Sequence, residues 1–362
     1  MQGSCLKQAV SLRLHPKGTV MRTVIYGAGS LGTVLGAYLT KQGIECDLIS
    51  RNKAHVTALQ QKGARIVGKA DFSVPVKARL PEQMQGTYNL IFLLTKQLEN
   101  RKVATFLRSY LAKDGLLVTM QNGLPESELA QVLGEQRVAG CAIGWGATLK
   151  ESGVAELTSE PEALAFSLGT LGKGREEMLK AVASMLDVMG PVTLEENFIG
   201  ARWSKLLINA SFSGTATVLG CTFGEVAKNK QSRRIAQLIL KECFDTGHRL
   251  GITFEPVQGK NLEKLFNYQG SFKQKLSFRL IPLAMKKHAS LKPSMLQDIE
   301  KGKKCEVESI NGILSKEGKR AGIATPVNDL IVQLIGKIET KQAYPGWSNL
   351  EAFKSFLSFL EK

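Results

Sequence analysis

The chain has 362 residues, 43% of them hydrophobic and 22% charged, which is the composition of a globular protein with room for two domains rather than of a disordered chain. Its net charge of +16 would suit a nucleic-acid partner. The basic residues are, however, spread along the chain without an aromatic-rich basic stripe, so we expect no nucleic-acid binding. We attribute the charge to a generally basic surface; a basic cleft would also suit an anionic cofactor and an anionic substrate.

Membrane, metal and disulfide chemistry receive no support from the sequence. No apolar run approaches the roughly 18 residues that a spanning helix needs, so we expect no membrane partner. The six cysteines are scattered without a C-x-x-C pair, which predicts neither a metal site nor a disulfide framework and favours a cytoplasmic location. Residues 1–20 lack the apolar core of a secretory signal, and we interpret them as an N-terminal extension, with a transit peptide as the alternative.

A strand, a glycine-rich turn and a helix open the first domain. The apolar run "TVIY" predicts the end of a buried strand, and Leu31 and Leu35 begin a helical pattern. Between them the spacing G-x-G-x-x-G is that of a dinucleotide-binding turn, in which glycines allow the tight turn, the approach of a pyrophosphate and the packing of helix on strand. An ordinary structural turn is the alternative. We predict a pyrophosphate site on Gly27, Ala28, Gly29, Ser30, Leu31 and Gly32.

Strands and helices then alternate through the first half of the chain. We expect a strand at 44–50, a helix to about residue 62, a two-stranded excursion around Gly68, a strand at 88–95, a helix around Val103 and Leu107, and strands at 115–120, 137–149, 153–157 and 163–169. This β-α-β alternation predicts an α/β domain, a Rossmann-type mostly parallel sheet covered on both faces.

The character of the sequence changes near residue 196. Helical patterns dominate at 197–217, 231–250, 258–288, 294–316 and 326–340, which predicts an all-helical second domain. The predicted parts are the extension 1–20, a cofactor domain 21–195, a helical substrate domain 196–340 and a tail helix 341–362. In the tail, an apolar stripe is expected to dock on the protein's own body rather than on a partner subunit: Leu350, Phe353, Leu357 and Leu360.

The end of the second strand bears on the choice between NAD and NADP. An acidic residue there binds the ribose 2′-hydroxyl of NAD, whereas an arginine accommodates the 2′-phosphate of NADP. Arg51 lies 19 residues beyond Gly32, where the discriminating residue usually sits, while the counter-candidate Asp47 lies within the strand. We therefore predict NADP(H), with a solvated loop residue as the alternative for Arg51.

Polar residues follow two further strands. Ligands of open α/β sheets bind beyond the carboxyl ends of the strands, where Lys96 and Asn122 are expected. Asn122-Gly123 is also a common turn pair, so a purely structural role stays open for Asn122.

The helical domain offers a second set of candidates. Lys205, Asn209 and Ser213 are four residues apart and share one face of an α-helix. In this apolar segment Lys205 either extends its ammonium to water or serves chemistry. Further on, Ser294 fits a capping box with Gln297, and Glu306 could be a surface charge.

Taken together, the motifs resemble those of the ketopantoate reductases (2-dehydropantoate 2-reductases). The resemblance runs from about Met21 to about Ile335, and its most specific parts are "RWSKLLINA" and "SMLQDIEKGKKCEVESINGIL". It implies a Rossmann domain joined to a helical domain like the C-terminal domains of 6-phosphogluconate dehydrogenases. It also implies an active site between these domains and NADPH-dependent reduction of 2-dehydropantoate to pantoate.

The resemblance also implies roles for individual residues. Lys205 would be the general acid that protonates the C2 oxygen, and Glu306 would contact the substrate and orient the lysine. Lys96 and Asn122 would position cofactor and substrate, and Asp298 would be a supporting residue. The polar groups of the substrate would be bound by Asn122, Asn209, Ser213 and Ser294.

One position departs from the family pattern. Ser213 stands where ketopantoate reductases often carry a second asparagine, which leaves another 2-oxo acid open as the substrate. A non-catalytic NADP-binding sensor is a further alternative, although a sensor would not need Lys205, Asn209 and Glu306. A homodimer is compatible with the sequence.

Overall fold

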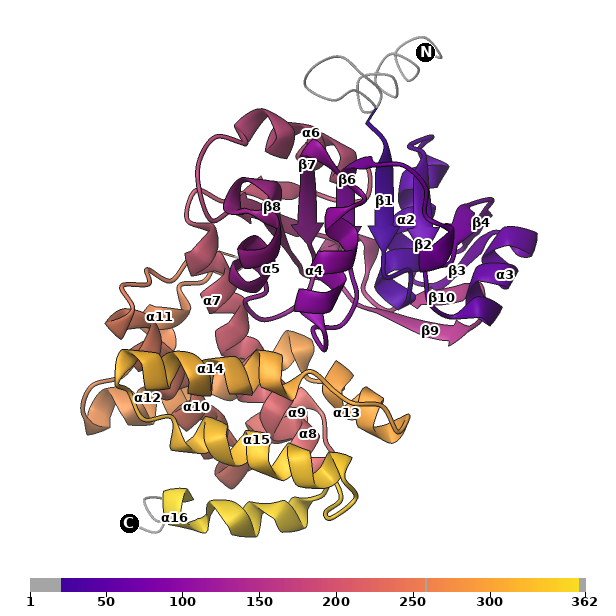
Figure 1. The fold of residues 1–362 in the computed structure, drawn as a ribbon. Helices are drawn as coiled ribbons and strands as arrows, with labels where there is room; N and C mark the ends of the chain where they lie inside the picture. The colour runs from indigo at the N-terminus through magenta and orange to yellow at the C-terminus, as the bar shows by residue number, and fades with distance from the viewer. Residues whose placement is uncertain (1–20, 258, 358–362) are drawn as a thin grey trace. The chain divides into compact units, whose positions relative to one another are not determined.

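The computed structural model describes residues 21–257 and 259–357, which form two compact units (Figure 1). The first unit ends at Phe198 and the second begins at Ile199, except that Asn122–Leu124 belong to the second. The predicted extension 1–20 and the tail residue Leu360 lie outside the described residues.

The first unit is built on an eight-stranded sheet in the order β12-β11-β8-β7-β6-β1-β2-β5. Its strands are parallel to their neighbours except at the antiparallel pair β8–β11. The bounds are β1 (Thr23–Tyr26), β2 (Cys46–Ile49), β5 (Lys77–Arg79), β6 (Tyr88–Leu93), β7 (Leu111–Thr119), β8 (Val138–Ile143), β11 (Phe166–Thr170) and β12 (Val192–Leu194). The run β5-β2-β1-β6-β7-β8 is the strand order of a Rossmann sheet, as predicted.

Helices cover both faces of this sheet because successive strand residues point to opposite sides. Val24 of β1 packs in the apolar cluster that contains Leu107 of α4, whereas Ile25 packs in the cluster that contains Leu35 of α2 and Val182 of α6. The helices of this unit are α2 (Ser30–Lys41), α3 (Lys53–Lys62), α4 (Asn100–Arg108), α5 (Glu126–Leu133) and α6 (Glu176–Leu186).

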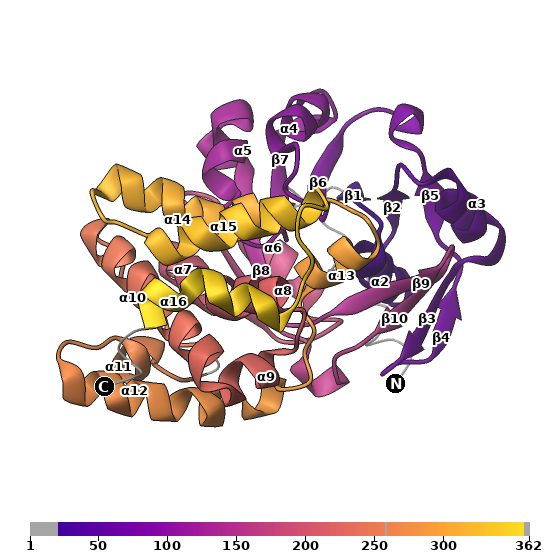
Figure 2. The ribbon, with the colours of Figure 1, turned by 90° about the horizontal axis from the view of Figure 1, so that it is seen from below.

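A smaller four-stranded sheet, in the order β4-β3-β10-β9, packs against α2, which also contacts the main sheet (Figure 2). Its strands are β3 (Ala64–Gly68), β4 (Phe72–Val74), β9 (Ala147–Glu151) and β10 (Val154–Leu157). The sequence predicts two strands after α3, and the structure has three. The hairpin β3–β4 ends before Pro75, which lacks a donor for the ladder, and the chain then returns to the main sheet as β5 beside β2.

The second unit is helical, as predicted. Its elements are α7 (Phe198–Ile208), a π-helical segment (Asn209–Gly214, hereafter the π segment), α8 (Thr215–Leu219), α9 (Phe223–Lys228), α10 (Lys230–Arg249), α11 (Leu262–Phe266), α12 (Ser271–Ala284), α13 (Ser294–Glu300), α14 (Val307–Ala321), α15 (Pro326–Glu339), the 3₁₀ turn η6 (Trp347–Phe353) and α16 (Lys354–Leu357).

Two helical stretches predicted as continuous are interrupted. Gly270, with φ of +81°, separates α11 from α12, and Gly302, with φ of +66°, lies between α13 and α14. These positive φ angles are outside the right-handed helical region.

The C-terminal tail packs on the helical unit. Phe353 and Leu357 are buried in its core, and Leu350 packs against that core. α16 lies against α10, and η6 lies against α8. In the part of the chain that the structure describes, no helix has the length and apolarity needed to cross a membrane.

Candidate functional site

The carboxyl ends of four parallel strands lie in register at one edge of the main sheet (Figure 1). Tyr26 of β1 faces Ile49 of β2 and Leu93 of β6, and Leu93 faces Thr119 of β7. The glycine turn begins, and Arg51 and Lys96 follow, within three residues of these strand ends. The sheet register therefore gathers the residues that the sequence predicts for a cofactor on the first unit.

The first glycine of the turn is required by the backbone. Gly27 has φ of +105°, and a Cβ there would lie 2.5 Å from the amide nitrogen of Thr95. Gly27 and Ala28 both donate their amides to the carbonyl of Ile49, at 3.0 and 2.8 Å. The turn is thus folded tightly across the ends of its two neighbouring strands.

The other two glycines meet different surroundings. A Cβ on Gly32 would lie 2.5 Å from the carbonyl oxygen of Gly27, so helix α2 packs directly on the turn. A Cβ on Gly29 would meet nothing within 4 Å. The start of α2 has no side-chain cap and no acidic residue in its first turn. Open space over Gly29 beside helical amides suits an anionic pyrophosphate, so these residues fit the diphosphate of a dinucleotide.

The side chains of Arg51 and Asp47 differ in their contacts and in their exposure. Asp47 accepts a hydrogen bond from Tyr88 Oη at 2.9 Å and lies 3.7 Å from Arg79 Nε, in a largely buried setting. The side chain of Arg51 is 75% exposed, and its Nη1 lies 3.9 Å from Glu99 Oε2. Burial and the Asp47 carboxylate together raise the pKa of Tyr88 to about 12. The Asp47 carboxylate is therefore occupied by contacts within the first unit, whereas the side chain of Arg51 is exposed at the end of its strand.

A buried amide network joins the ends of β6 and β7. Gln121 Nε2 donates to the carbonyl of Thr95 at 2.8 Å and to Asn100 Oδ1 at 2.8 Å. Its Oε1 accepts from Thr119 Oγ1 at 2.9 Å. The network ties the strand ends that carry Lys96 and Asn122 to the start of α4. Asn100 was not predicted from the sequence, where it looks like one more residue of a polar loop.

A second unpredicted residue, His55, holds three elements of the first unit together. Its Nε2 lies 3.0 Å from Thr33 Oγ1 of α2, and its Nδ1 accepts from the amide of Gly153 at 3.0 Å. Since Nδ1 is the acceptor, the neutral ring carries its proton on Nε2. Burial lowers the pKa of His55, which favours this neutral form.

The predicted residues of the second unit begin on α7 and the π segment. Lys205 and Asn209 are half-buried, and Ser213 is buried. Four residues overshoot a full turn of an α-helix, which has about 3.6 residues per turn. They fall short of the wider turn of a π-helix, whose hydrogen bonds join residues i and i+5. The π segment therefore brings Ser213 back toward the direction of Lys205, a feature that the sequence did not predict.

Ser294 and Glu306 lie on elements that contact the π segment, namely α13 and the start of α14. The capping-box interpretation of Ser294 is wrong, because Pro293 is the N-cap and Gln297 Nε2 donates to the carbonyl of Lys292 at 3.2 Å. The surface-charge interpretation of Glu306 is also wrong, because this N-cap residue of α14 is only 8% exposed. The structure thus gathers Asn209, Ser213 and the elements of Ser294 and Glu306 within one unit.

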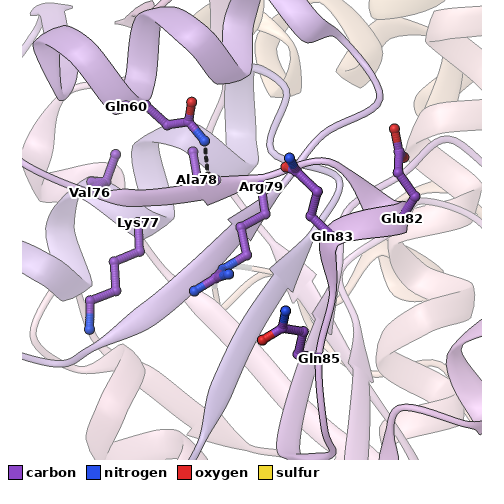
Figure 3. Close-up of a pocket in the computed structure, with 8 residues that line it drawn as sticks. All are labelled: Gln60, Val76, Lys77, Ala78, Arg79, Glu82, Gln83 and Gln85. Atoms are coloured by element: carbon purple, nitrogen blue, oxygen red, sulfur yellow. Dashed lines mark hydrogen bonds between the residues drawn. The ribbon is translucent and has the colours of Figure 1, made fainter.

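A shallow polar pocket of about 630 Å³ lies at the outer strand β5 of the main sheet (Figure 3). Lys77 and Arg79 extend from the same side of this strand, and Gln60 Nε2 donates to the carbonyl of Ala78 at 2.9 Å. The lining residues are Gln60, Val76, Lys77, Ala78, Arg79, Glu82, Gln83 and Gln85. None of them belongs to the predicted site.

Comparisons with known proteins agree with this architecture. The family model for ketopantoate reductase PanE/ApbA matches residues 23–169, and the model for its C-terminal part matches residues 197–339. The 2-dehydropantoate 2-reductase of Pyrococcus abyssi is 28% identical over 330 residues, covering 90% of this chain and 99% of its own. That of Pyrococcus horikoshii is 26% identical over 318 residues, covering 87% and 96%.

Among solved structures, a ternary complex of D-mandelate dehydrogenase with NADH and anilino(oxo)acetate superimposes with a TM-score of 0.77 at 22% identity, covering 89% of this chain and 99% of its own. A Rossmann-type sheet with a dinucleotide turn, joined to a helical unit, is the architecture of two-domain oxidoreductases that act on CH–OH groups. The chain belongs to the ketopantoate reductase family.

Proposed function

We propose that the protein reduces 2-dehydropantoate to pantoate with NADPH, using Lys205 as the general acid. The observation that carries the proposal is the grouping in the second unit. Lys205 lies one turn before Asn209, and α13 and α14, which carry Ser294 and Glu306, pack on the π segment. This grouping supplies a cation, amide and hydroxyl groups and a buried carboxylate to one substrate.

The first unit supplies the cofactor site in this proposal. Gly27, Gly29 and Gly32 hold the pyrophosphate on the first amides of α2, and Lys96 and Asn122 help to position the nicotinamide and the substrate. The bound cofactor supplies the hydride that adds to the C2 carbon. The exposed guanidinium of Arg51 binds the 2′-phosphate and thereby selects NADPH over NADH.

The second unit supplies the proton. Reduction of a ketone at C2 places negative charge on the carbonyl oxygen, and an ammonium at that oxygen stabilises the charge and then donates a proton to complete the hydroxyl. Lys205 has this role and regains its proton from solvent. Glu306 orients the lysine and accepts a hydrogen bond from the substrate hydroxyl. Asn209, Ser213 and Ser294 bind the remaining polar groups.

A second candidate is the reduction of a bulkier 2-oxo acid by the same residues. It is favoured by Ser213, a short side chain where the family resemblance leads us to expect an asparagine. The fold is also shared with a D-mandelate dehydrogenase, a 2-hydroxy acid enzyme that was solved with an aromatic oxo acid.

A substrate panel tests both candidates. The oxidation of NADPH and of NADH is followed spectrophotometrically with ketopantoate, 2-oxoisovalerate and phenylpyruvate. The leading proposal predicts the highest kcat/KM for ketopantoate with NADPH. A higher kcat/KM for phenylpyruvate would support the second candidate, and absence of turnover with every pair would contradict both.

A further inference from the structure

A network of buried side-chain hydrogen bonds on other helices (Asn311, Asn328 and Glu242; hereafter the amide network) contacts the backbone of the π segment. Asn311 of α14 donates from Nδ2 to the carbonyl of Ala210, at 3.0 Å, and to Asn328 Oδ1 of α15, at 2.8 Å. Asn328 in turn donates from its Nδ2 to Glu242 Oε2 of α10 at 2.7 Å. The successive helices α14 and α15 and the more distant α10 are therefore connected through hydrogen bonds to the backbone of the π segment.

Glu242 connects the amide network to the beginning of α15 through two backbone hydrogen bonds. The amide of Val327 donates to its Oε1 at 2.8 Å, and the amide of Asn328 donates to its Oε2 at 3.0 Å. These are amides of the first helical turn, which have no partner within the helix and which favour a negative charge. The carboxylate on α10 therefore sets the position of α15, and with it the position of the Asn328 side chain.

Burying the polar groups of the amide network costs free energy. Asn311 and Asn328 are fully buried, and burial raises the pKa of Glu242 to about 7 although its hydrogen bonds to α15 act in the opposite direction. Apolar side chains of similar size would fill a helical core at a lower cost. The presence of the amide network beside the π segment therefore indicates that the geometry of this segment matters.

The amide of Asn311 packs closely on the π segment at Gly214. A Cβ on Gly214 would lie 2.5 Å from Asn311 Oδ1, so the amide packs directly on the backbone of the segment. Hydroxyls supply further donors to nearby carbonyls, since Ser211 Oγ donates to Leu207 at 2.8 Å and Thr217 Oγ1 donates to Ser213 at 2.7 Å. Such side-chain donors satisfy carbonyls where the regular helical ladder is interrupted.

We propose that Asn311 is a positioning residue, which together with Asn328 and Glu242 holds the π segment in the geometry that presents Asn209 and Ser213 to the substrate. The inference rests on the proposed function in one respect, the assignment of Asn209 and Ser213 to the 2-oxo acid. π-helical turns are rare and occur often at functional sites, which agrees with this role.

The first test is Asn311→Ala, which removes the donor to the Ala210 carbonyl. We expect the KM for the best 2-oxo acid to rise by about tenfold or more, with the Kd for NADPH within about twofold of the wild-type value. The thermal midpoint will also fall, since a buried amide is lost. This fall alone would not distinguish positioning from packing.

A second variant makes that distinction. In Gly214→Ala/Asn311→Ala the new methyl group fills the space that the amide vacates, and alanine is the better helix former. We expect the thermal midpoint to recover toward the wild-type value while the KM stays high, because the donor to Ala210 is still missing. Recovery of KM together with stability would overturn the proposal, because packing alone would then explain the effect. The matched control is Asp245→Asn, one turn beyond Glu242 on α10 and paired with Lys241, which should leave KM unchanged.

An independent measurement does not depend on activity. Asn311→Ala should accelerate amide hydrogen exchange in peptides that cover Asn209–Gly214 by about tenfold or more, and Asp245→Asn should not. Unchanged exchange there would overturn the proposal even in an active enzyme. Conversely, faster exchange in Asn311→Ala, combined with no turnover of any 2-oxo acid by the wild-type protein, would contradict the proposed function. It would still support the structural role of the amide network.

Discussion

Gly29→Ala tests the cofactor site with little expected effect on folding. A Cβ at this position meets no atom within 4 Å, and the φ of Gly29, −89°, lies outside the left-handed region that favours glycine. The added methyl group therefore projects into the open space where the proposal places a pyrophosphate. We expect an unchanged thermal midpoint and a weaker binding of NADPH.

The magnitude follows from the bonds that would be displaced. A hydrogen bond from a backbone amide to a charged group contributes about 1.5 to 3 kcal/mol. At about 1.4 kcal/mol for each factor of ten, the loss of one such bond raises the Kd by roughly 10- to 150-fold. Titration calorimetry of NADPH against the wild-type protein and the variant measures this ratio.

Two other glycines serve as controls. Gly336→Ala in α15 also meets no atom within 4 Å and should leave NADPH binding unchanged. Gly27→Ala should instead destabilise the first unit, because its Cβ would lie 2.5 Å from the backbone nitrogen of Thr95 at a φ of +105°. Wild-type affinity in Gly29→Ala would refute the placement of the pyrophosphate over this turn.

Three further predictions concern cofactor choice, substrate choice and pH. Arg51→Ala should raise the KM for NADPH much more than that for NADH, and equal effects in steady-state kinetics would remove Arg51 from the 2′-phosphate site. Ser213→Asn should change the ratio of kcat/KM between ketopantoate and phenylpyruvate, and an unchanged ratio would show that this side chain does not contact the substrate. Burial lowers the pKa of His55, so the unfolded chain binds a proton near pH 6.5 that the folded protein does not, and the contribution of His55 to stability falls as the pH decreases below this value, whereas Glu242, with a pKa raised to about 7, acts in the opposite direction. Between about pH 7.5 and about pH 5.5 the thermal midpoint of His55→Gln should therefore shift upward relative to that of the wild type, and an identical pH dependence would exclude a contribution of His55.

The sequence was most informative where function and local structure use the same residues. The spacing of Gly27, Gly29 and Gly32 predicts a tight turn with a helix packed on it, and the structure has this turn; a pyrophosphate over Gly29 stays a prediction. The parallel sheet also followed from the alternation of apolar runs with helical patterns. Its register then gathers strand ends that lie far apart in the chain, which no local pattern specifies.

What the sequence did not predict depends on long-range contacts. The bond between Glu242 and Asn328 joins residues 86 positions apart, and neither residue belongs to a recognisable local motif. The π segment is equally hidden, because nothing in "NASFSG" departs from helical periodicity. Ser294 resembled a capping residue by its spacing to Gln297, yet the helix begins one residue earlier, with Pro293 as its N-cap.

The most direct test of the account is the effect of Lys205→Ala on the reduction of the best 2-oxo acid. Loss of a general acid should lower kcat by roughly 100- to 10,000-fold, while the Kd for NADPH changes little because the glycine turn is untouched. Lys205→Arg should not restore the full rate, since a guanidinium holds its proton too tightly. A near-normal kcat in Lys205→Ala would contradict the account, because the proton would then come from another group.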